Sequence, residues 1–296
     1  MDAIISMIQS LGIMLLAPLV AGIIKTVKAR LQNRRGPSVL QPYFDLMKLL
    51  GKDSVVSPTV SWIFHVAPYV YFAGAFAAAA ILSVAFFPRN NFGDLFTLIY
   101  VLALGRFFLV MASLDGGSAF GGMGGAREMF IGILVEPAML LSILTIAIKA
   151  QTTNVGMMVE SVGNPLLSLH YVFASLAFYI VLLTETGRIP VDNPDTHLEL
   201  TMIHEGMVLE YSGRKLALIF WASAVKQLIL IVLFVLLFLP GSIFSGAPII
   251  GIILKVLLVA LFIAGTETIT NKMRLFNVPK FLALSCLLSL LALVAQ

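Results

Sequence analysis

Residues 215–239 read KLALIFWASAVKQLILIVLFVLLFL, and this apolar stretch decides the fold class. A helix needs about 20 predominantly apolar residues to cross the hydrocarbon core of a bilayer, and this stretch is longer, with only Lys226 charged in its interior. The whole chain has the same character: 59% of its 296 residues are hydrophobic and 11% are charged, and its mean hydropathy is +1.01. Because soluble domains carry about 25% charged residues, this composition excludes soluble enzyme folds.

Seven further stretches are long and apolar enough to span a bilayer. The sequence therefore predicts an all-α polytopic membrane protein with eight transmembrane helices in a single integral membrane domain, residues 1–296. The expected spans cover about 3–24, 63–87, 95–114, 129–149, 165–184, 215–239, 247–266 and 278–295.

The basic residues predict the orientation of these spans. Fourteen of the 19 Lys and Arg residues lie in or beside four loops, 25–62, 115–128, 185–214 and 267–277, and the opposite connections hold only Arg89 and Lys149. The positive-inside rule places these four loops in the cytoplasm and both termini on the extracytoplasmic side. The basic residues that give the chain its pI near 9.2 thus lie mostly in the cytoplasmic loops beside the lipid bilayer. No nucleic acid is expected as a partner.

Two of the cytoplasmic loops have a pattern of their own. Residues 38–51, SVLQPYFDLMKLLG, place apolar side chains at helical spacing, which predicts a short amphipathic helix on the membrane surface or against a partner. The glycine-rich run at 116–126 contains neither a phosphate-binding lysine nor a GxGxxG spacing, so we expect a flexible hairpin there.

Four charged residues fall inside expected spans, where insertion of a charge costs about 2.5–3.5 kcal/mol. Glu136, in the run FIGILVEPAMLLSIL, is followed by Pro137, which interrupts the helical hydrogen bonds. Such a carboxylate favours a role in proton transfer, although a neutral or ion-paired glutamate is the alternative. The three basic residues Arg106, Lys226 and Lys255 are either part of the same path or plain ion-pair partners.

The loop 185–213 is rich in acids. Clustered carboxylates raise one another's proton affinity, so the loop favours a proton relay, with a solvated acidic loop as the alternative. It holds six of the 15 acids, Glu185, Asp192, Asp195, Glu199, Glu205 and Glu210.

Metal chemistry within the chain has little support. Cys286 is the single cysteine, so neither a disulfide framework nor an iron–sulfur cluster can be built from this chain. His204 and Glu205 lack the second histidine of a zinc protease helix. No metal or cofactor is therefore expected in this chain, and any redox centre belongs to a partner.

Two segments resemble a known family. RLQNRRGP at 30–37 with LQPYFDLMKLLGKD at 40–53 is similar to the first cytoplasmic loop of the membrane subunit shared by respiratory complex I (subunit 1) and membrane-bound nickel–iron hydrogenases. TETGRIPVDNPDTHLEL at 184–200, with EYSGRKLAL at 210–218, resembles the acidic loop of that family. The run ILVEP, where complex I members end in YE, resembles the formate-hydrogenlyase type of energy-converting hydrogenase, subunit 4.

The resemblance implies a membrane subunit that anchors a peripheral electron-transfer module and couples its redox reaction to proton or sodium translocation. It implies iron–sulfur small and nickel–iron large subunits on the cytoplasmic face, which would hold the redox centres, and antiporter-like subunits within the prokaryotic cytoplasmic (inner) membrane. The quinone-site subunit of complex I, a stand-alone ion transporter and a purely structural anchor stay open as alternatives.

Candidate residues follow from the charges and the resemblance together. Expected proton-transfer residues are Glu128, Glu136, Glu185, Asp192, Glu199, Glu205, Glu210 and Lys226. Arg106, Arg127, Arg188 and Lys255 would set the local potential, and Arg30, Arg34, Arg35, Pro37, Asp45 and Lys48 would dock the partner.

Overall fold

The computed structural model describes residues 2–84, 93–161, 168–193, 202–239 and 248–295. These residues form eleven α-helices and one 3-10 helix. In chain order the helices are α1 Asp2–Leu31, α2 Gln41–Leu50, α3 Trp62–Val84, α4 Leu95–Asp115, α5 Ala119–Ala150, α6 Val155–Ser161, α7 Leu169–Glu185, α8 His204–Val208, α9 Gly213–Phe238, α10 Pro248–Ile269, η2 Leu275–Asn277 and α11 Val278–Val294.

Among the described residues, seven helical segments are long and apolar enough to cross a membrane. They are α1, α3, α4, α5, α9, α10 and the continuous segment of η2 and α11. The span expected at 165–184 corresponds to α7, which is apolar but only 17 residues long. The fold is thus an all-α membrane protein with about seven candidate spans, and eight are not confirmed.

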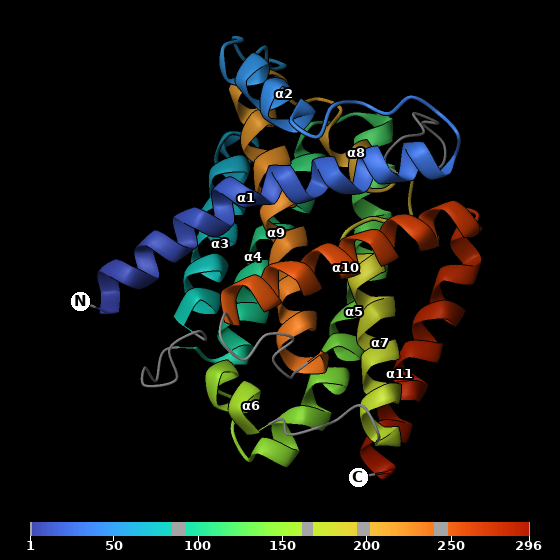
Figure 1. Ribbon diagram of the computed structural model, residues 1–296. Helices are drawn as coiled ribbons and strands as arrows, with labels where there is room; N and C mark the ends of the chain where they lie inside the picture. Colours follow the sequence, from blue (N-terminus) through green and yellow to red (C-terminus); the bar gives the residue numbers. More distant parts are fainter. Residues whose placement is uncertain (1, 85–92, 162–167, 194–201, 240–247, 296) are drawn as a thin grey trace.

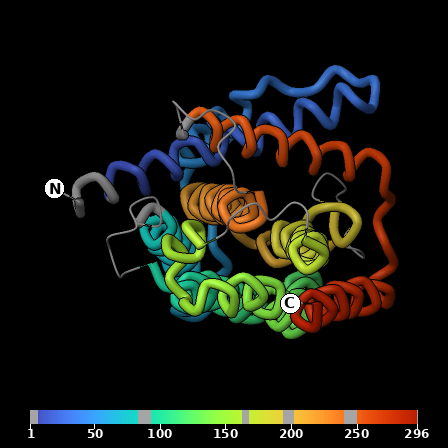
Figure 2. Tube along the Cα trace, turned by 60° about the horizontal axis from the view of Figure 1, so that its bottom comes forward, coloured from blue at the N-terminus to red at the C-terminus, as the bar shows by residue number. Residues whose placement is uncertain are grey.

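The helices form a bundle with two members lying across it. α3, α4, α5, α7, α9 and α11 run roughly along one direction, whereas α1 and α10 lie side by side and cross one face of the bundle at a steep angle (Figures 1 and 2). Both crossing helices pack against α9 as well as against each other. α9 is therefore enclosed, and most residues of its second half are buried.

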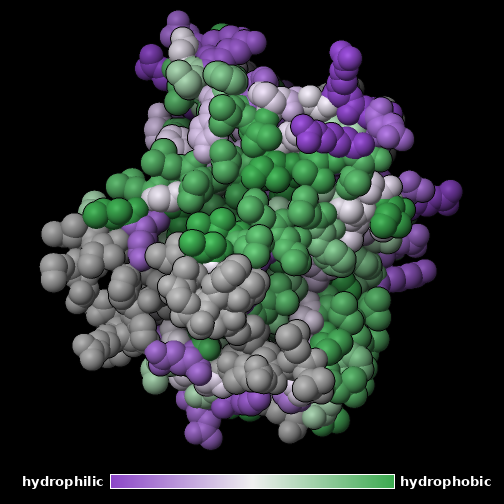
Figure 3. Space-filling model, viewed as in Figure 1, coloured by the Kyte–Doolittle hydropathy of each residue, from purple (hydrophilic) through white to green (hydrophobic). Residues whose placement is uncertain are grey.

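The outside of the bundle is apolar. Large side chains such as Leu15, Ile133 and Leu258 are exposed, and Figure 3 shows a broad hydrophobic band across one face with hydrophilic residues above it near α2 and below it. An exposed apolar surface of this extent is typical of a protein whose solvent is the bilayer.

The glycine-rich run differs from the expected hairpin within 115–128. α5 begins at Ala119, so most of the run forms the first turns of a helix. A Cβ atom at Gly124 would lie 3.0 Å from the backbone of Gly206 and Met207 in α8. The absence of a side chain there lets α8 lie directly on α5, and this tertiary contact outweighs the low helix propensity of glycine.

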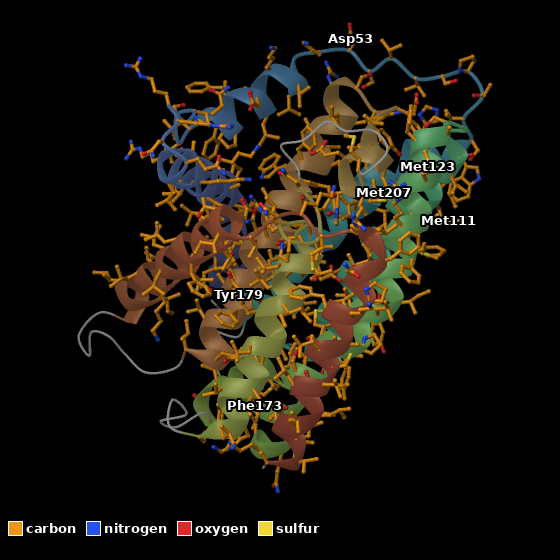
Figure 4. The ribbon with its side chains drawn as sticks, turned by 90° about the vertical axis from the view of Figure 1, so that its right-hand side faces the viewer. Asp53, Met111, Met123, Phe173, Tyr179 and Met207 are labelled. Carbon is orange, nitrogen blue, oxygen red and sulfur yellow. The ribbon has the colours of Figure 1, made fainter. Side chains whose placement is uncertain are left out.

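The surface segment 38–51 contains a helix, α2, which has no buried residue. It contacts α1 and α9, and the Tyr43 hydroxyl donates to the backbone carbonyl of Leu15 in α1. α2 thus lies at one end of the bundle, beside the connection that carries Asp53 (Figures 1 and 4).

Candidate functional site

Arg106 is the centre of a buried ionic cluster. Its side chain extends from the middle of α4, and its guanidinium lies close to Gly132 of α5, where no side chain occupies the space. Nη1 lies 2.5 Å from Oε1 of Glu185, and Nη2 pairs with Oε1 of Glu136. One forked side chain thereby links α4, α5 and the end of α7.

Lys226 completes this central cluster, which we define as Arg106, Glu136, Glu185 and Lys226. Its ammonium Nζ lies 2.5 Å from Oε2 of Glu185, so that carboxylate is paired with two cations. Glu136 has Arg106 as its cation, and its side chain is 38% exposed, whereas that of Glu185 is 5% exposed. The two cations and two carboxylates are balanced, which offsets the cost of burying them.

A second group, the loop cluster, consists of Glu128, Asp192, His204 and Lys272. His204 Nε2 lies 3.4 Å from Glu128 Oε2, and His204 Nδ1 lies 3.5 Å from Asp192 Oδ2. Asp192 Oδ1 lies 2.7 Å from Lys272 Nζ, and Oδ2 accepts hydrogen bonds from the amides of Ile203 and His204. The cluster therefore joins the start of α8 and the segment after α7 to α5 and to the segment after α10.

The pKa values of two groups in the loop cluster, His204 and Asp192, are shifted from their ordinary values. Burial opposes a charged imidazole at His204, but Glu128 and Asp192 outweigh it and raise the pKa of His204. Burial also opposes a charged Asp192, but His204 and Lys272 hold the pKa of that carboxyl far below its usual range. The imidazole is thus stabilised in its charged form between two carboxylates.

Glu128 connects the loop cluster with the central cluster. Glu128, Gly132 and Glu136 are spaced four residues apart and therefore share one face of α5. Glu128 faces His204 at one end of this face, and Glu136 faces Arg106 at the other. Figure 4 shows the region where α8 meets α5, marked by Met123 and Met207 near one end of the bundle.

A third group, the α10 cluster, consists of Lys28, Arg188, Gln227 and Glu267. Glu267 is paired with Lys28 of α1 at 3.1 Å and with Arg188 at 3.2 Å, and its side chain has no exposed surface. Arg188 Nη2 also donates to Gln227 Oε1 of α9 at 2.9 Å. Next to Glu267, Thr266 shares a hydrogen bond of 2.9 Å with the hydroxyl of Tyr179 in α7, which is labelled in Figure 4.

The other candidate residues lie apart from these clusters or outside the described residues. Arg127 donates to the carbonyl of Met202 at 3.0 Å, and Lys255 donates to the carbonyl of Leu239 at 2.5 Å. Glu210 is exposed, and Glu199 lies outside the described residues. Arg30 is exposed in the last turn of α1, and Arg34, Arg35 and Pro37 are exposed in the connection after it. Asp45, Lys48 and Glu205 line a cavity.

Five members of these clusters were not among the candidates from the sequence: Lys28, His204, Gln227, Glu267 and Lys272. Lys28 and Glu267 lie just beyond the ends of expected spans, and only their helical continuation places them inside the protein. His204 is 76 residues from Glu128, so the sequence carries no local sign of that contact. Within the described parts of the chain, no three His, Cys, Asp or Glu residues are arranged to hold a metal ion.

The sequence matches the model of a known protein family. A family model described as NADH dehydrogenase matches residues 4–296. The chain belongs to the NADH dehydrogenase family. This confirms the resemblance: the chain is a multi-pass, complex I-like membrane subunit.

Individual members of the family match over most of their length. Formate hydrogenlyase subunit 4 of Escherichia coli K12 is 38% identical over 244 residues, covering 81% of this chain and 78% of that protein. Hydrogenase-4 component C of the same organism is 38% identical over 243 residues, covering 80% and 75%. NADH-ubiquinone oxidoreductase chain 1 of Dictyostelium citrinum is 28% identical over 256 residues, covering 82% and 78%.

A solved structure shares the fold. A chain of the membrane-bound sulfane sulfur reductase, an archaeal respiratory membrane complex, superposes with a TM-score of 0.83 at 20% identity. The match covers 100% of this chain and 99% of that chain. The likeness extends over the whole fold, including the two crossing helices.

Proposed function

We propose that this chain is the membrane subunit of a nickel–iron hydrogenase complex of the formate-hydrogenlyase type. In this proposal it anchors the peripheral electron-transfer module and couples the redox reaction of that module to proton or sodium translocation. The redox centres, iron–sulfur clusters and a nickel–iron site, belong to partner subunits. The chain itself supplies the membrane anchor and the ionisable groups.

The higher identity to hydrogenase subunits supports this side of the family. The two hydrogenase relatives are 38% identical to the chain, whereas the NADH-ubiquinone oxidoreductase relative is 28% identical. The run ILVEP around Glu136 points to the same branch.

The observation that carries the coupling proposal is a succession of ionisable side chains from the end of the bundle to its interior. Lys272, Asp192, His204 and Glu128 follow one another at 2.7, 3.5 and 3.4 Å. The shared face of α5 then leads from Glu128 to Arg106 and Glu136. Intramembrane carboxylates in such a succession are typical of proton pathways.

The geometry supports different tasks for the two carboxylates of the central cluster. Glu185 is held by two cations and fixes the positions of α4, α7 and α9. Glu136 has one cation and is partly exposed, so it is better placed to take up and release an ion. A change at a docked partner would move the loop cluster, alter the charge at Glu128 and thereby change the ion affinity of Glu136.

The proposal also includes the orientation of the chain and its partner subunits. α7 would serve as an eighth span, which places both termini on the extracytoplasmic side of the prokaryotic cytoplasmic membrane. The small and large hydrogenase subunits would dock on the end of the bundle that carries α2 and α8. Antiporter-like membrane subunits would continue the path within the bilayer.

The test uses inverted membrane vesicles from cells that carry the complete complex. Glu136→Gln keeps the shape of the side chain but cannot release a proton, so we expect assembly and hydrogen production to continue while acidification of the vesicle interior falls at least tenfold. Glu160→Gln is the matched control, because Glu160 is an exposed acid in α6. Normal acidification in the Glu136→Gln vesicles would refute the coupling proposal.

The same preparation separates this proposal from the other functions considered. A stand-alone transporter would move protons or sodium when the purified chain is placed in liposomes without a redox partner. A structural anchor would lose its partner subunits when the acidic loop is neutralised, for example at Asp192, but the complexes that remain assembled would keep their coupling. A complex I subunit would show quinone reduction that depends on this chain.

A further inference from the structure

The run EYSG at 210–213 lies between α8 and α9, and none of its residues belongs to the three buried clusters. Its serine, Ser212, contacts the connection between α2 and α3, residues 51–61. Ser212 Oγ accepts a hydrogen bond from the amide of Val55 at 2.8 Å and donates one to the carbonyl of the same residue at 2.9 Å. One hydroxyl thereby uses its donor and an acceptor lone pair on a single residue far away in the chain.

Ser212 is the N-cap residue of α9, but its side chain does not cap that helix. A serine at this position ordinarily accepts a hydrogen bond from the backbone amide two or three residues further on and thereby stabilises the helix. In this protein the hydroxyl is directed to Val55 instead. The side chain at position 212 therefore contributes to the contact between two distant segments and not to the start of α9.

The two residues after this serine extend the contact. Gly213 has a φ of +56°, and a Cβ atom there would lie 2.5 Å from the backbone oxygen of Asp53. Glycine adopts this conformation without strain and leaves space for the carbonyl. Arg214 Nε donates to the carbonyl of Leu50, the last residue of α2, at 3.2 Å. We call these contacts between residues 212–214 and residues 50–55 the clip.

The clip is joined directly to α8 through Tyr211. The amide of Tyr211 donates to the carbonyl of Val208, the last residue of α8, at 3.0 Å. Its ring stacks on Phe64 of α3 with the centroids 4.0 Å apart, and its hydroxyl donates to the Phe64 carbonyl at 2.9 Å. α8 has only five residues and begins at His204, which belongs to the loop cluster. One short helix thus separates the clip from the loop cluster.

We propose that Ser212 and Gly213 are positioning residues that tie the connection between α2 and α3 to the loop cluster. A partner that displaces this connection then moves Ser212 and α8 with it, and the distances from His204 to its two carboxylates change. The proposed function supplies the identity of that partner, and the proposal rests on it to this extent. The clip itself is a property of this chain and can be tested without knowing the partner.

Amide-resolved hydrogen–deuterium exchange tests the clip in the full chain, purified in mild detergent with the subunits that remain bound. Ser212→Ala removes the hydroxyl but no helix cap, so the start of α9 should keep its structure. Exchange at the Val55 amide should become about three- to tenfold faster, because its acceptor is lost. Exchange at the amides of Ile203 and His204, which donate to Asp192, should become about twofold faster or more.

Three further variants separate the clip from other effects. Ser57→Ala makes the same substitution in the same connection, but the Ser57 hydroxyl is bonded to Thr59, so exchange at these three amides should not change. Ser212→Thr keeps the hydroxyl on a backbone that is extended, which suits a β-branched residue, and should restore normal exchange. Gly213→Ala presses a Cβ atom against the Asp53 carbonyl and should accelerate exchange like Ser212→Ala.

Inverted vesicles with the complete complex connect the clip to coupling. Hydrogen production should continue in Ser212→Ala, while acidification per hydrogen produced should fall about twofold or more and return in Ser212→Thr. Faster exchange at Val55 with unchanged exchange at Ile203 and His204 would overturn the proposal, and so would normal acidification per hydrogen in Ser212→Ala. Absence of acidification in unaltered vesicles would instead refute the proposed function, and the exchange measurement would still decide whether the clip controls α8.

Discussion

The central cluster and the α10 cluster are built alike but differ in one carboxylate. Each contains a buried acid between two cations: Glu185 between Arg106 and Lys226, and Glu267 between Lys28 and Arg188. The central cluster adds Glu136, which is partly exposed. A carboxylate enclosed by two cations holds helices together, whereas one with a single cation and access to its surroundings can exchange its charge. Burial of a charge therefore does not by itself indicate transport.

The two clusters also share their supports. Lys226 and Gln227 are neighbours on α9, and successive helical residues point about 100° apart, so they serve different sides of the same helix. Glu185 is the last residue of α7 and Arg188 lies in the turn that follows, and each serves one of the two clusters. α9 and the end of α7 therefore support both clusters.

The largest expected effect is a loss of stability when the α10 cluster is broken. Glu267→Gln removes the buried carboxylate that pairs with both Lys28 and Arg188, which should cost about 3–5 kcal/mol. For a chain of this size that corresponds to a fall in Tm of roughly 10 °C. Thermal unfolding in detergent, followed by tryptophan fluorescence, measures it. An unchanged Tm would show that Glu267 does not act as a brace.

A smaller effect is expected from Arg106→Lys in the central cluster. An ammonium keeps the positive charge but cannot bind Glu136 and Glu185 through a planar fork, so one charged hydrogen bond is lost, about 1.5–3 kcal/mol. Coupling should fall as well, because Glu136 loses its fixed position. The comparison is Arg188→Lys, which should reduce Tm but leave vesicle acidification per hydrogen produced unchanged. Equal loss of coupling in both variants would contradict the division of roles.

Glu136→Gln in the central cluster should lower stability much less than Glu267→Gln in the α10 cluster. Arg106 keeps Glu185 as a partner, and the Glu136 side chain is 38% exposed, so we expect a cost of about 1 kcal/mol or less. The Tm of this variant should lie within about 3 °C of that of the unaltered chain. A fall as large as that of Glu267→Gln would make Glu136 a structural residue.

The sequence predicted the long apolar helices well and their ends poorly. The expected span 95–114 agrees with α4, Leu95–Asp115, because both ends coincide with polar residues. The expected span 3–24 stops seven residues before α1 ends at Leu31, and 247–266 stops three residues before α10 ends at Ile269. Hydropathy marks where apolar residues stop, whereas a helix continues as long as its backbone hydrogen bonds do.

The position of a charged residue relative to an apolar run decides whether the sequence reveals it as a site residue. Arg106, Glu136 and Lys226 were recognised because a charge inside an apolar run is conspicuous in the sequence. Lys28 and Glu267 were missed because they lie in the helical continuations beyond the apolar runs. The pairings themselves join residues far apart in the chain, such as Arg106 with Glu185, and no periodicity within one segment encodes them.

The smallest expected effect is a pH response of the loop cluster. Because the pKa of His204 is raised, the stabilisation by its charged form is complete below the ordinary histidine pKa, about 6.5, and is lost as pH rises through the raised value. The lowered pKa of Asp192 keeps its contacts intact above about 3.9, so they are lost only in strong acid. Between these limits the loop should stay attached to α5.

Hydrogen–deuterium exchange tests this response at the amides of Ile203 and His204, which donate to Asp192. After correction for the intrinsic rate, their protection should fall as pH rises above neutrality, by less than about 1 kcal/mol because the imidazole contacts are long. His204→Gln should remove the pH dependence and leave weaker, constant protection. The end of α10 is the comparison region, because this helix contains no histidine, and it should show no such fall. A parallel fall at both places would mean that the loop cluster and the α10 cluster open together.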